Sequence, residues 1–287
     1  MAETGANAPR PASTVVLLRD AVGGPRGVEV FLMRRHGASG FMAGATVFPG
    51  GKVDAEDACA GSGAGPNPLI ALPFFVAALR ELHEESHVLL ARDGSGNLPE
   101  AAAVAALDAR LDELRTGHRL ACADWHRCVA DAGFDPALDL LVPFAHWVTP
   151  QVEPRRFDTY FFAAACPPGQ DATLDRHEST DAFWMTPAAA LAAHASGGPI
   201  ALPPPTQHTL MRLEAMRMEG CETTQQTLVR LAAEGIGPRI EPHFIADSAD
   251  GPVILMPWDV QHPDARGTTR LDRFVLQDGR FSRRQTA

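Results

Sequence analysis

The sequence lacks the features of a membrane, secreted or nucleic-acid-binding protein. It has no apolar run of the roughly 20 residues that a membrane-spanning helix needs. The first 13 residues hold no apolar segment like that of a signal peptide, and we expect 1–13 to be disordered. The 25 basic side chains are outnumbered by 35 acidic ones, which gives a net charge of −10. We therefore expect neither nucleic acid nor an anionic membrane as a partner.

Cysteine is also scarce and irregularly placed. The five cysteines are odd in number and contain no C-x-x-C pair: they are Cys59, Cys122, Cys128, Cys166 and Cys221. This pattern predicts reduced thiols and a cytoplasmic protein. The last residues, 285–287, do not form a peroxisomal address. Without repeats or a long linker, 14–287 is expected to form one elaborated α/β domain.

Hydrophobic spacing and turn residues predict the order of helices and strands. Helices are expected over 100–115, 121–132, 188–195, 206–218 and 223–234. Strands are expected over 15–18, 28–33, 144–150 and 157–163, before Trp184, and in short pieces at 244–245, 253–256 and 273–276. Thr186 and Thr206 are the expected helix caps. The helices between about 98 and 135 form an insertion, which we interpret as a packing or homodimer element rather than a lid.

A charged stretch at 80–88 indicates a metal site. It contains no Gly or Pro and is expected to be helical, so that Glu81, Glu84 and Glu85 share one face. Like charges at this spacing repel by some tenths of a kcal/mol per pair. A hard divalent cation removes that penalty, because Mg²⁺ and Mn²⁺ prefer carboxylate oxygens. The carbonyl of Gly51, in a Gly50–Gly51 turn that lets backbone approach closely, could complete the ligand set.

These residues resemble the Nudix box. Gly51, Asp57, Arg80, Val88 and the three glutamates occupy its positions, with Asp57 standing where Glu is usual. The chain departs from the pattern at two points. Residues 58–79 separate Asp57 from Arg80, where the pattern has seven residues, and His87 stands where it has Gly. Part of the long spacer, 58–72, is rich in Ala, Gly and Pro and is expected to be a loop.

The resemblance extends upstream of the box to the branch of peroxisomal coenzyme A diphosphatases. Arg35, Gly44 and the run 48–51 match the coenzyme A signature of this branch, whereas His36 and Gly40 do not. The resemblance implies a Nudix α/β/α sandwich with a mixed sheet, a helical insertion and a C-terminal extension over about 200–287.

The same resemblance implies a metal-dependent hydrolase that uses Mg²⁺ or Mn²⁺ to cleave a nucleoside diphosphate linked to another moiety. Coenzyme A and its thioesters lead the candidate substrates, before ADP-ribose, NADH and dinucleoside polyphosphates. The expected catalytic residues are Glu81, Glu84, Glu85, Arg80 and Glu178, with Glu81 or Glu178 as base. The expected substrate-binding residues are Arg34, Arg35, Arg156, Gly50 and Gly51.

Two other classes of function compete with this interpretation. His83-Glu84-Glu85-Ser86-His87 is a literal H-E-x-x-H sequence, which is typical of zinc metallopeptidases. That hypothesis leaves Glu81, the Gly-Gly turn and the upstream strands unexplained. A non-catalytic nucleotide-binding module with the same fold is the second alternative, since His87 replaces a glycine of the pattern.

Overall fold

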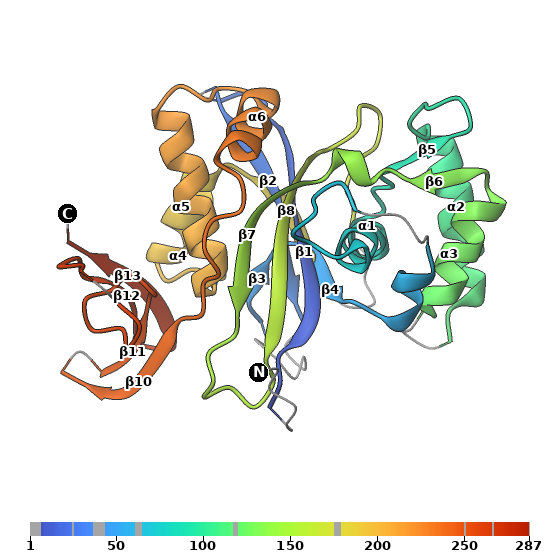
Figure 1. Cartoon of the computed structure of the whole chain (residues 1–287). Coiled ribbons are helices and arrows are strands. Elements are labelled where there is room, and N and C mark those ends of the chain that lie inside the picture. The colour runs from blue at the N-terminus through green and yellow to red at the C-terminus, as the bar shows by residue number, and fades with distance from the viewer. Residues whose placement is uncertain are drawn as a thin grey trace.

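The computed structural model describes residues 7–24, 26–36, 44–60, 65–116, 120–174, 179–249, 251–265 and 267–286. Its centre is a 7-stranded mixed sheet with the path β3-β2-β1-β8-β7, to which β4 and β9 are added beside β1 and β2 (Figure 1). The strands are β1 Arg10–Asp20, β2 Val28–Arg35, β3 Thr46–Val47, β4 Gly50–Lys52, β7 Val142–Val148, β8 Phe157–Ala165 and β9 Ser179–Met185. Strands β1 and β8 are parallel, and the other pairs are antiparallel.

Helices cover both faces of this sheet (Figure 1). The helices are α1 Leu72–Ser86, α2 Ala101–Leu114, α3 Cys122–Asp131, α4 Pro187–Ala195, α5 Pro204–Met218 and α6 Thr224–Glu234, with short 3-10 turns η1 Ala55–Ala60 and η2 Leu138–Leu140. Successive residues of β1 face opposite layers, as a pleated strand requires. Val15 and Leu17 pack with α1, whereas Val16 and Leu18 pack with α5 and α6. The continuous apolar run 15–18 is therefore explained by a strand buried on both faces.

The predicted insertion forms a small layer beyond α1. Helices α2 and α3 enclose Trp125, Val104 and Leu111, which pack against Leu89 and Ala91, just after the charged segment 80–88. A short sheet of β5 Ala91–Asp93 and β6 Phe134–Pro136 joins the two ends of the insertion. The insertion thus lies against the helix that carries the glutamates, on the side away from the central sheet (Figure 1).

The C-terminal extension ends in a 4-stranded antiparallel sheet with the order β10-β11-β12-β13. Its strands are β10 His243–Ser248, β11 Gly251–Leu255, β12 Asp272–Gln277 and β13 Arg280–Gln285. The guanidinium of Arg280 donates to the carbonyl of Ile200, at 2.8 Å, and to the carbonyls of Gly198 in the same connection and His194 in α4. Phe274 belongs to the same buried cluster as Leu210 of α5. These contacts attach the extension to the α4–α5 side of the molecule.

Two local expectations differ from the structure. β1 begins at Arg10, inside the segment expected to be disordered, because 10–18 pair with β8 and 12–14 also pair with β4. Helix α5 begins at Pro204, and Thr206 lies within its first turn instead of capping it. Proline is well suited to the first helical turn, where its missing N–H has no partner to lose. The cap at Thr186 is confirmed, since its hydroxyl accepts from the Ala189 N–H at 3.2 Å.

Among the described residues, no helix combines the length and the apolar character that crossing a bilayer requires. The expected cytoplasmic location stays a prediction.

The junction of α5 with the C-terminal sheet contains a half-buried histidine, His208, whose ionisation we expect to affect stability. The ring of His208 lies between Trp147 and Trp258, with centroid distances of 5.5 and 5.8 Å. Burial, with the nearby cation of Arg283, lowers the pKa of His208 to about 4. The unfolded chain has a histidine pKa of about 6.5 and binds the proton first, so lowering the pH destabilises the fold. Between pH 7 and pH 5 this histidine should reduce the free energy of unfolding by about 2 kcal/mol.

Urea unfolding at several pH values checks this expectation. The wild-type protein and His208→Gln should differ in the slope of unfolding free energy against pH, whatever their difference at pH 7. Parallel curves over pH 5–7 would show that His208 is protonated alike in the folded and unfolded states.

Candidate active site

A cleft of about 630 Å³ lies at the end of the central sheet where β1 and β8 begin and β7 ends. Its volume is typical of sites for small molecules. Gly50 and Gly51, expected in a turn, begin strand β4, and we call this pair, at the point where the chain enters β4, the Gly-Gly turn. Helix α1 and the Gly-Gly turn form one side of the cleft, and residues of α5 and the C-terminal sheet form the other. Predicted site residues that line it are Arg35, Gly50, Gly51, Arg80, Glu81, Glu84 and Glu85.

The turn and the helix contact each other directly. The Gly50 N–H donates to Glu85 Oε2 at 2.7 Å. A Cβ atom on Gly51 would lie 2.4 Å from the carboxyl carbon of Glu81, and one on Gly50 would lie 2.4 Å from the Ser13 carbonyl oxygen. Both glycines are therefore explained by close approach of the backbone, to a carboxylate in one case and to β1 in the other.

Arg80 lies at the centre of the charged side chains on the α1 side of the cleft. It is 2% exposed, and its guanidinium donates to both carboxylate oxygens of Asp57, at 3.0 and 2.9 Å. It also donates to Glu81 Oε1 at 2.8 Å and, more weakly, to Glu84 Oε1 at 3.4 Å. Although burial alone lowers the pKa of Arg80, the bond to Asp57 and the nearby glutamates raise it well above its usual value. Arg80 therefore stays charged and orients two of the three glutamates.

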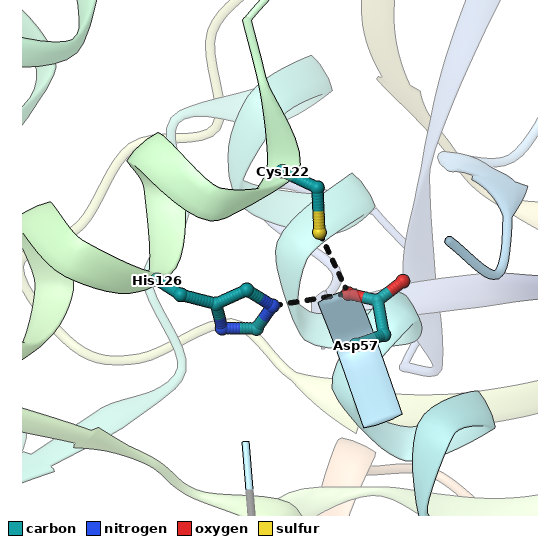
Figure 2. Close-up of side chains that lie close together, drawn as sticks. All are labelled: Asp57, Cys122 and His126. Carbon is teal, nitrogen blue, oxygen red and sulfur yellow. Dashed lines mark hydrogen bonds and ion pairs between the residues drawn. The ribbon is translucent and has the colours of Figure 1, made fainter. Parts of the chain in front are cut away.

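The insertion contacts Arg80 indirectly, because side chains of α3 bind Asp57, the partner of Arg80. Figure 2 shows Cys122 and His126 of α3 pointing at this carboxylate, with Cys122 Sγ at 3.3 Å and His126 Nε2 at 3.2 Å from Oδ1. Burial would raise the pKa of Asp57, but hydrogen bonds from His126 and Arg80 hold it well below its usual range. Asp57 is thus an ionised support for Arg80 rather than a ligand facing the cleft.

A possible metal site has to be considered at the same place. In the described part of the chain, one group of possible metal ligands has its ligand atoms within 4.8 Å of one another, and it consists of Asp57, Cys122 and His126. The Arg80 guanidinium already occupies both oxygens of Asp57, and a second cation there would be repelled. Burial, with the adjacent Asp57 charge, raises the pKa of the Cys122 thiol far above neutrality, so the thiolate that a metal needs is disfavoured. We interpret this group as a hydrogen-bonded support for Arg80.

The three glutamates of α1 form an acidic site that suits a divalent cation. Burial, followed by the charge of Glu81, raises the pKa of Glu84 to about 8. Since burial is the larger cause, the elevation means that ionising Glu84 is costly in this site and that Arg80 does not remove the whole cost. The carboxylates do not converge as closely as the Asp57 group, since Glu85 is bonded to Gly50 and Glu81 to Arg80. Their oxygen donors are those that Mg²⁺ or Mn²⁺ prefers.

The histidines of the H-E-x-x-H sequence do not form a zinc site with Glu84. His83 Nε2 and His87 Nδ1 lie 3.0 and 3.1 Å from the two carboxylate oxygens of Asp108 on α2. His83 Nδ1 accepts from Trp125 Nε1 at 2.9 Å. Helix α1 ends at Ser86, and His87 follows in the left-handed conformation with φ 58°. Glycine adopts this conformation at lower cost, which explains the glycine that the family pattern places there.

The remaining predicted residues lie in different surroundings. Arg34 pairs with Asp181 at 3.6 Å and is not among the described residues that line the cleft. Arg156 also lies outside that set, because its buried guanidinium donates to Glu241 at 2.6 Å and to the Thr149 carbonyl at 3.0 Å. The predicted base Glu178 lies outside the described residues, as does Gly40 of the coenzyme A signature.

Sequence reasoning missed two cations of the cleft. Lys52 lines it directly after the Gly-Gly turn, and Arg115 lines it at the end of α2 in the insertion. Lys52 could have been noticed from its place beside the turn. Arg115 carries no such signal, because only the packing of the insertion against α1 brings it to Glu84, whose pKa its charge lowers.

Comparison with known proteins identifies the class to which this fold and site belong. The family model described as the NUDT19 Nudix domain matches residues 66–213, and the chain therefore belongs to the Nudix family. The predicted Nudix sandwich, the coenzyme A diphosphatase branch and the enzyme class, a Nudix-type diphosphatase, are confirmed.

Individual relatives agree with this assignment. The chain is 30% identical over 192 residues to a putative nudix hydrolase 7 from Caenorhabditis elegans, covering 66% of this chain and 57% of that protein. It is 29% identical over 307 residues to the acyl-coenzyme A diphosphatase NUDT19 of Gallus gallus, covering 89% of this chain and 80% of that protein. Its fold matches the crystal structure of a NUDIX hydrolase from Alicyclobacillus acidocaldarius with a TM-score of 0.64 and 26% identity, over 81% of this chain and 99% of that one.

Proposed function

We propose that this protein uses Mg²⁺ or Mn²⁺ to hydrolyse the diphosphate that joins a nucleoside to a second moiety, with coenzyme A or an acyl-coenzyme A as the leading substrate. The observation that carries the proposal is the acidic face of α1 against the Gly50–Gly51 turn, inside a cleft that also contains cations. The printed name of the Gallus gallus relative, an acyl-coenzyme A diphosphatase, supports the choice of substrate.

Each residue of the charged side has a proposed role. Glu81, Glu84 and Glu85, with the Gly51 carbonyl, would hold the metal. When bound, the metal supplies positive charge against the diphosphate and makes water a stronger nucleophile. Arg80 orients Glu81 through the 2.8 Å hydrogen bond, and Glu81 or Glu178 takes the proton from the attacking water.

Arg35 is the proposed phosphate-binding cation. It lines the cleft, and its buried Nε has no hydrogen-bond partner among the described residues. The Nε of Arg34 is likewise without a described partner, but Arg34 is not among the described residues that line the cleft. A buried guanidinium N–H without an acceptor costs free energy, which a substrate phosphate would recover by accepting from it. Lys52 and Arg115, in the same cleft, add to the positive potential that a diphosphate meets.

The proposed function is tested by mass spectrometry of the products. The protein is incubated with Mg²⁺ or Mn²⁺ and coenzyme A, an acyl-coenzyme A, ADP-ribose, NADH or a dinucleoside polyphosphate. Release of 3′,5′-ADP and a phosphopantetheine from coenzyme A is the expected result. Cleavage of another compound would keep the chemistry and change the substrate. Binding of metal and nucleotide without any cleavage would instead identify a non-catalytic binding module.

Neighbouring arginines provide a matched test of the phosphate contact. Arg35→Met should raise KM about tenfold or more, because a charge-assisted hydrogen bond to phosphate is lost. Arg34→Met removes the same charge from the next residue, whose partner is Asp181, and should change KM less than threefold. Steady-state kinetics on both variants checks this expectation. Equal effects on KM would contradict the proposal that Arg35, and not Arg34, binds the phosphate.

The Gly-Gly turn allows a separate test of how Glu81 is placed. Gly51→Ala should reduce kcat about a hundredfold, because the new methyl group occupies the position of the Glu81 carboxylate. Gly24→Ala is the matched control, since a Cβ atom there meets no atom within 4 Å. Turnover and thermal unfolding are measured together. Full activity of a folded Gly51→Ala protein would show that Glu81 can move without consequence.

A further inference from the structure

The side of the cleft opposite the glutamates is apolar. The C-terminal sheet contributes Phe244, Ile254 and Phe281, all half-buried, and β7 contributes Trp147. We call the three residues from the C-terminal sheet, together with Trp147, the apolar wall. Trp147 is buried, whereas the other three side chains are partly exposed inside the cleft rather than scattered over the outer surface, which indicates a site for an apolar ligand group.

The register of the C-terminal sheet shows how the wall is built. Phe244 pairs with Ile254, and Ile254 pairs with Phe274 on the next strand, so the three share one face of the sheet. Phe274 is fully buried in the core that includes α5, whereas Phe244 and Ile254 reach the cleft. The wall is thus a continuation of the hydrophobic core to the edge of the site.

Polar contacts hold this face in place. The carbonyl of Phe281 lies 2.7 Å from His194 Nε2 and accepts from Gln207 Nε2 at 2.8 Å. The Arg156 guanidinium binds Glu241, which stands just before the strand that carries Phe244. Arg156 therefore holds the start of the extension beside the cleft. A wall anchored on both sides is a preformed surface, which loses little conformational entropy when a ligand covers it.

The cations of the cleft come from other elements than this wall. The cations among the described lining residues come from β2, β4, α1 and the insertion, and are Arg35, Lys52, Arg80 and Arg115. Within the same set, the C-terminal sheet supplies no charged side chain. A phosphorylated nucleoside is therefore favoured near the cations, and the wall is suited to an uncharged, apolar part of the substrate.

We propose that the C-terminal extension forms an acyl-binding subsite, in which the apolar wall contacts the fatty-acyl chain of an acyl-coenzyme A while the diphosphate lies at the glutamates. This inference rests on the proposed function and specifies the part of the substrate that the extension recognises. The extension then determines chain-length preference, whereas α1 and the Gly-Gly turn perform the hydrolysis.

The test measures kcat/KM for coenzyme A and its acetyl, butyryl and octanoyl thioesters by product analysis. Wild-type protein should prefer the octanoyl over the acetyl thioester by about tenfold, because buried methylene groups contribute to transition-state binding. Phe244→Ala should reduce this ratio by about fivefold or more. Ile254→Thr, which keeps a β-branched side chain in the strand, is a second variant that removes apolar surface at lower risk to folding.

Ile245→Ala is the matched control. Ile245 lies next to Phe244 on β10 but packs on the opposite face, with Val253 and Val275. It should lower thermal stability and leave the octanoyl-to-acetyl ratio within twofold of wild type. An unchanged ratio in folded Phe244→Ala and Ile254→Thr, or a wild-type protein indifferent to chain length, would overturn the subsite while the hydrolase stands. Failure of wild-type protein to cleave any diphosphate would overturn the proposed function itself, and the subsite with it.

Discussion

Glu85→Gln is expected to reduce kcat for diphosphate hydrolysis at least a hundredfold while the protein remains folded. The substitution removes one of the three carboxylates proposed to hold the metal, and charge stabilisation by such groups typically contributes two to three orders of magnitude. The amide oxygen can still accept the Gly50 N–H, now bonded at 2.7 Å to Glu85, so the turn and helix should keep their contact. Affinity for Mn²⁺, measured by isothermal titration calorimetry, should fall in parallel.

Glu113→Gln makes the same chemical change on the exposed surface of α2 and is the matched control. It should leave both turnover and metal affinity at the wild-type level. Circular dichroism and thermal unfolding establish that each variant is folded. Undiminished turnover in folded Glu85→Gln would show that Glu85 does not hold the metal, and would overturn the proposed mechanism.

Asp57→Asn is expected to produce the largest loss of stability. Asp57 is fully buried and accepts two hydrogen bonds from Arg80, a geometry that an amide cannot reproduce. Removing one member of a buried ion pair costs about 3 kcal/mol, and Arg80 would keep only part of its compensation, from Glu81 and more weakly from Glu84. Arg80 also orients Glu81, so kcat should fall by about tenfold or more, even at temperatures where the variant is folded.

Asp139→Asn is the comparison for this substitution. Asp139 pairs with Arg92 at 2.8 Å, but its side chain is 64% exposed, and such pairs contribute less than about 1 kcal/mol. Urea unfolding at pH 7 should therefore separate the two variants by about 2 kcal/mol or more. If both lose equally little stability, the Asp57–Arg80 pair is not the structural support that its burial indicates.

Much of the fold could be predicted because its signals are local. The helices of the insertion and the cap at Thr186 depend on side-chain spacing and backbone hydrogen bonding within a few residues. Boundaries were less predictable where distant partners decide them. The start of β1 is such a boundary, since it depends on pairing with β8. The earlier start of α5 is different, because the prolines of its first turn are a local signal that the expected cap at Thr206 left unused.

The candidate site divides in the same way. The common helical face of Glu81, Glu84 and Glu85 beside the two glycines could be predicted, since it follows from the helical period and the Nudix pattern. The surroundings of these glutamates depend on how distant segments pack. The tertiary structure directs His83 and His87 to Asp108 instead of a zinc ion, and it places Arg35, but neither Arg34 nor Arg156, in the cleft.

Two further features depend on tertiary structure: the contacts of the insertion that support Arg80, and the apolar wall. Asp57, Arg80 and His126 meet from three separate segments, and Phe244 reaches the cleft from a strand far along the chain. Such contacts depend on how packed layers bring distant residues together, and the local spacing of side chains carries no information about them. The helix that carries the glutamates can therefore be predicted from the sequence. The residues that support Arg80, and the apolar wall proposed to select the substrate, are brought into place by packing.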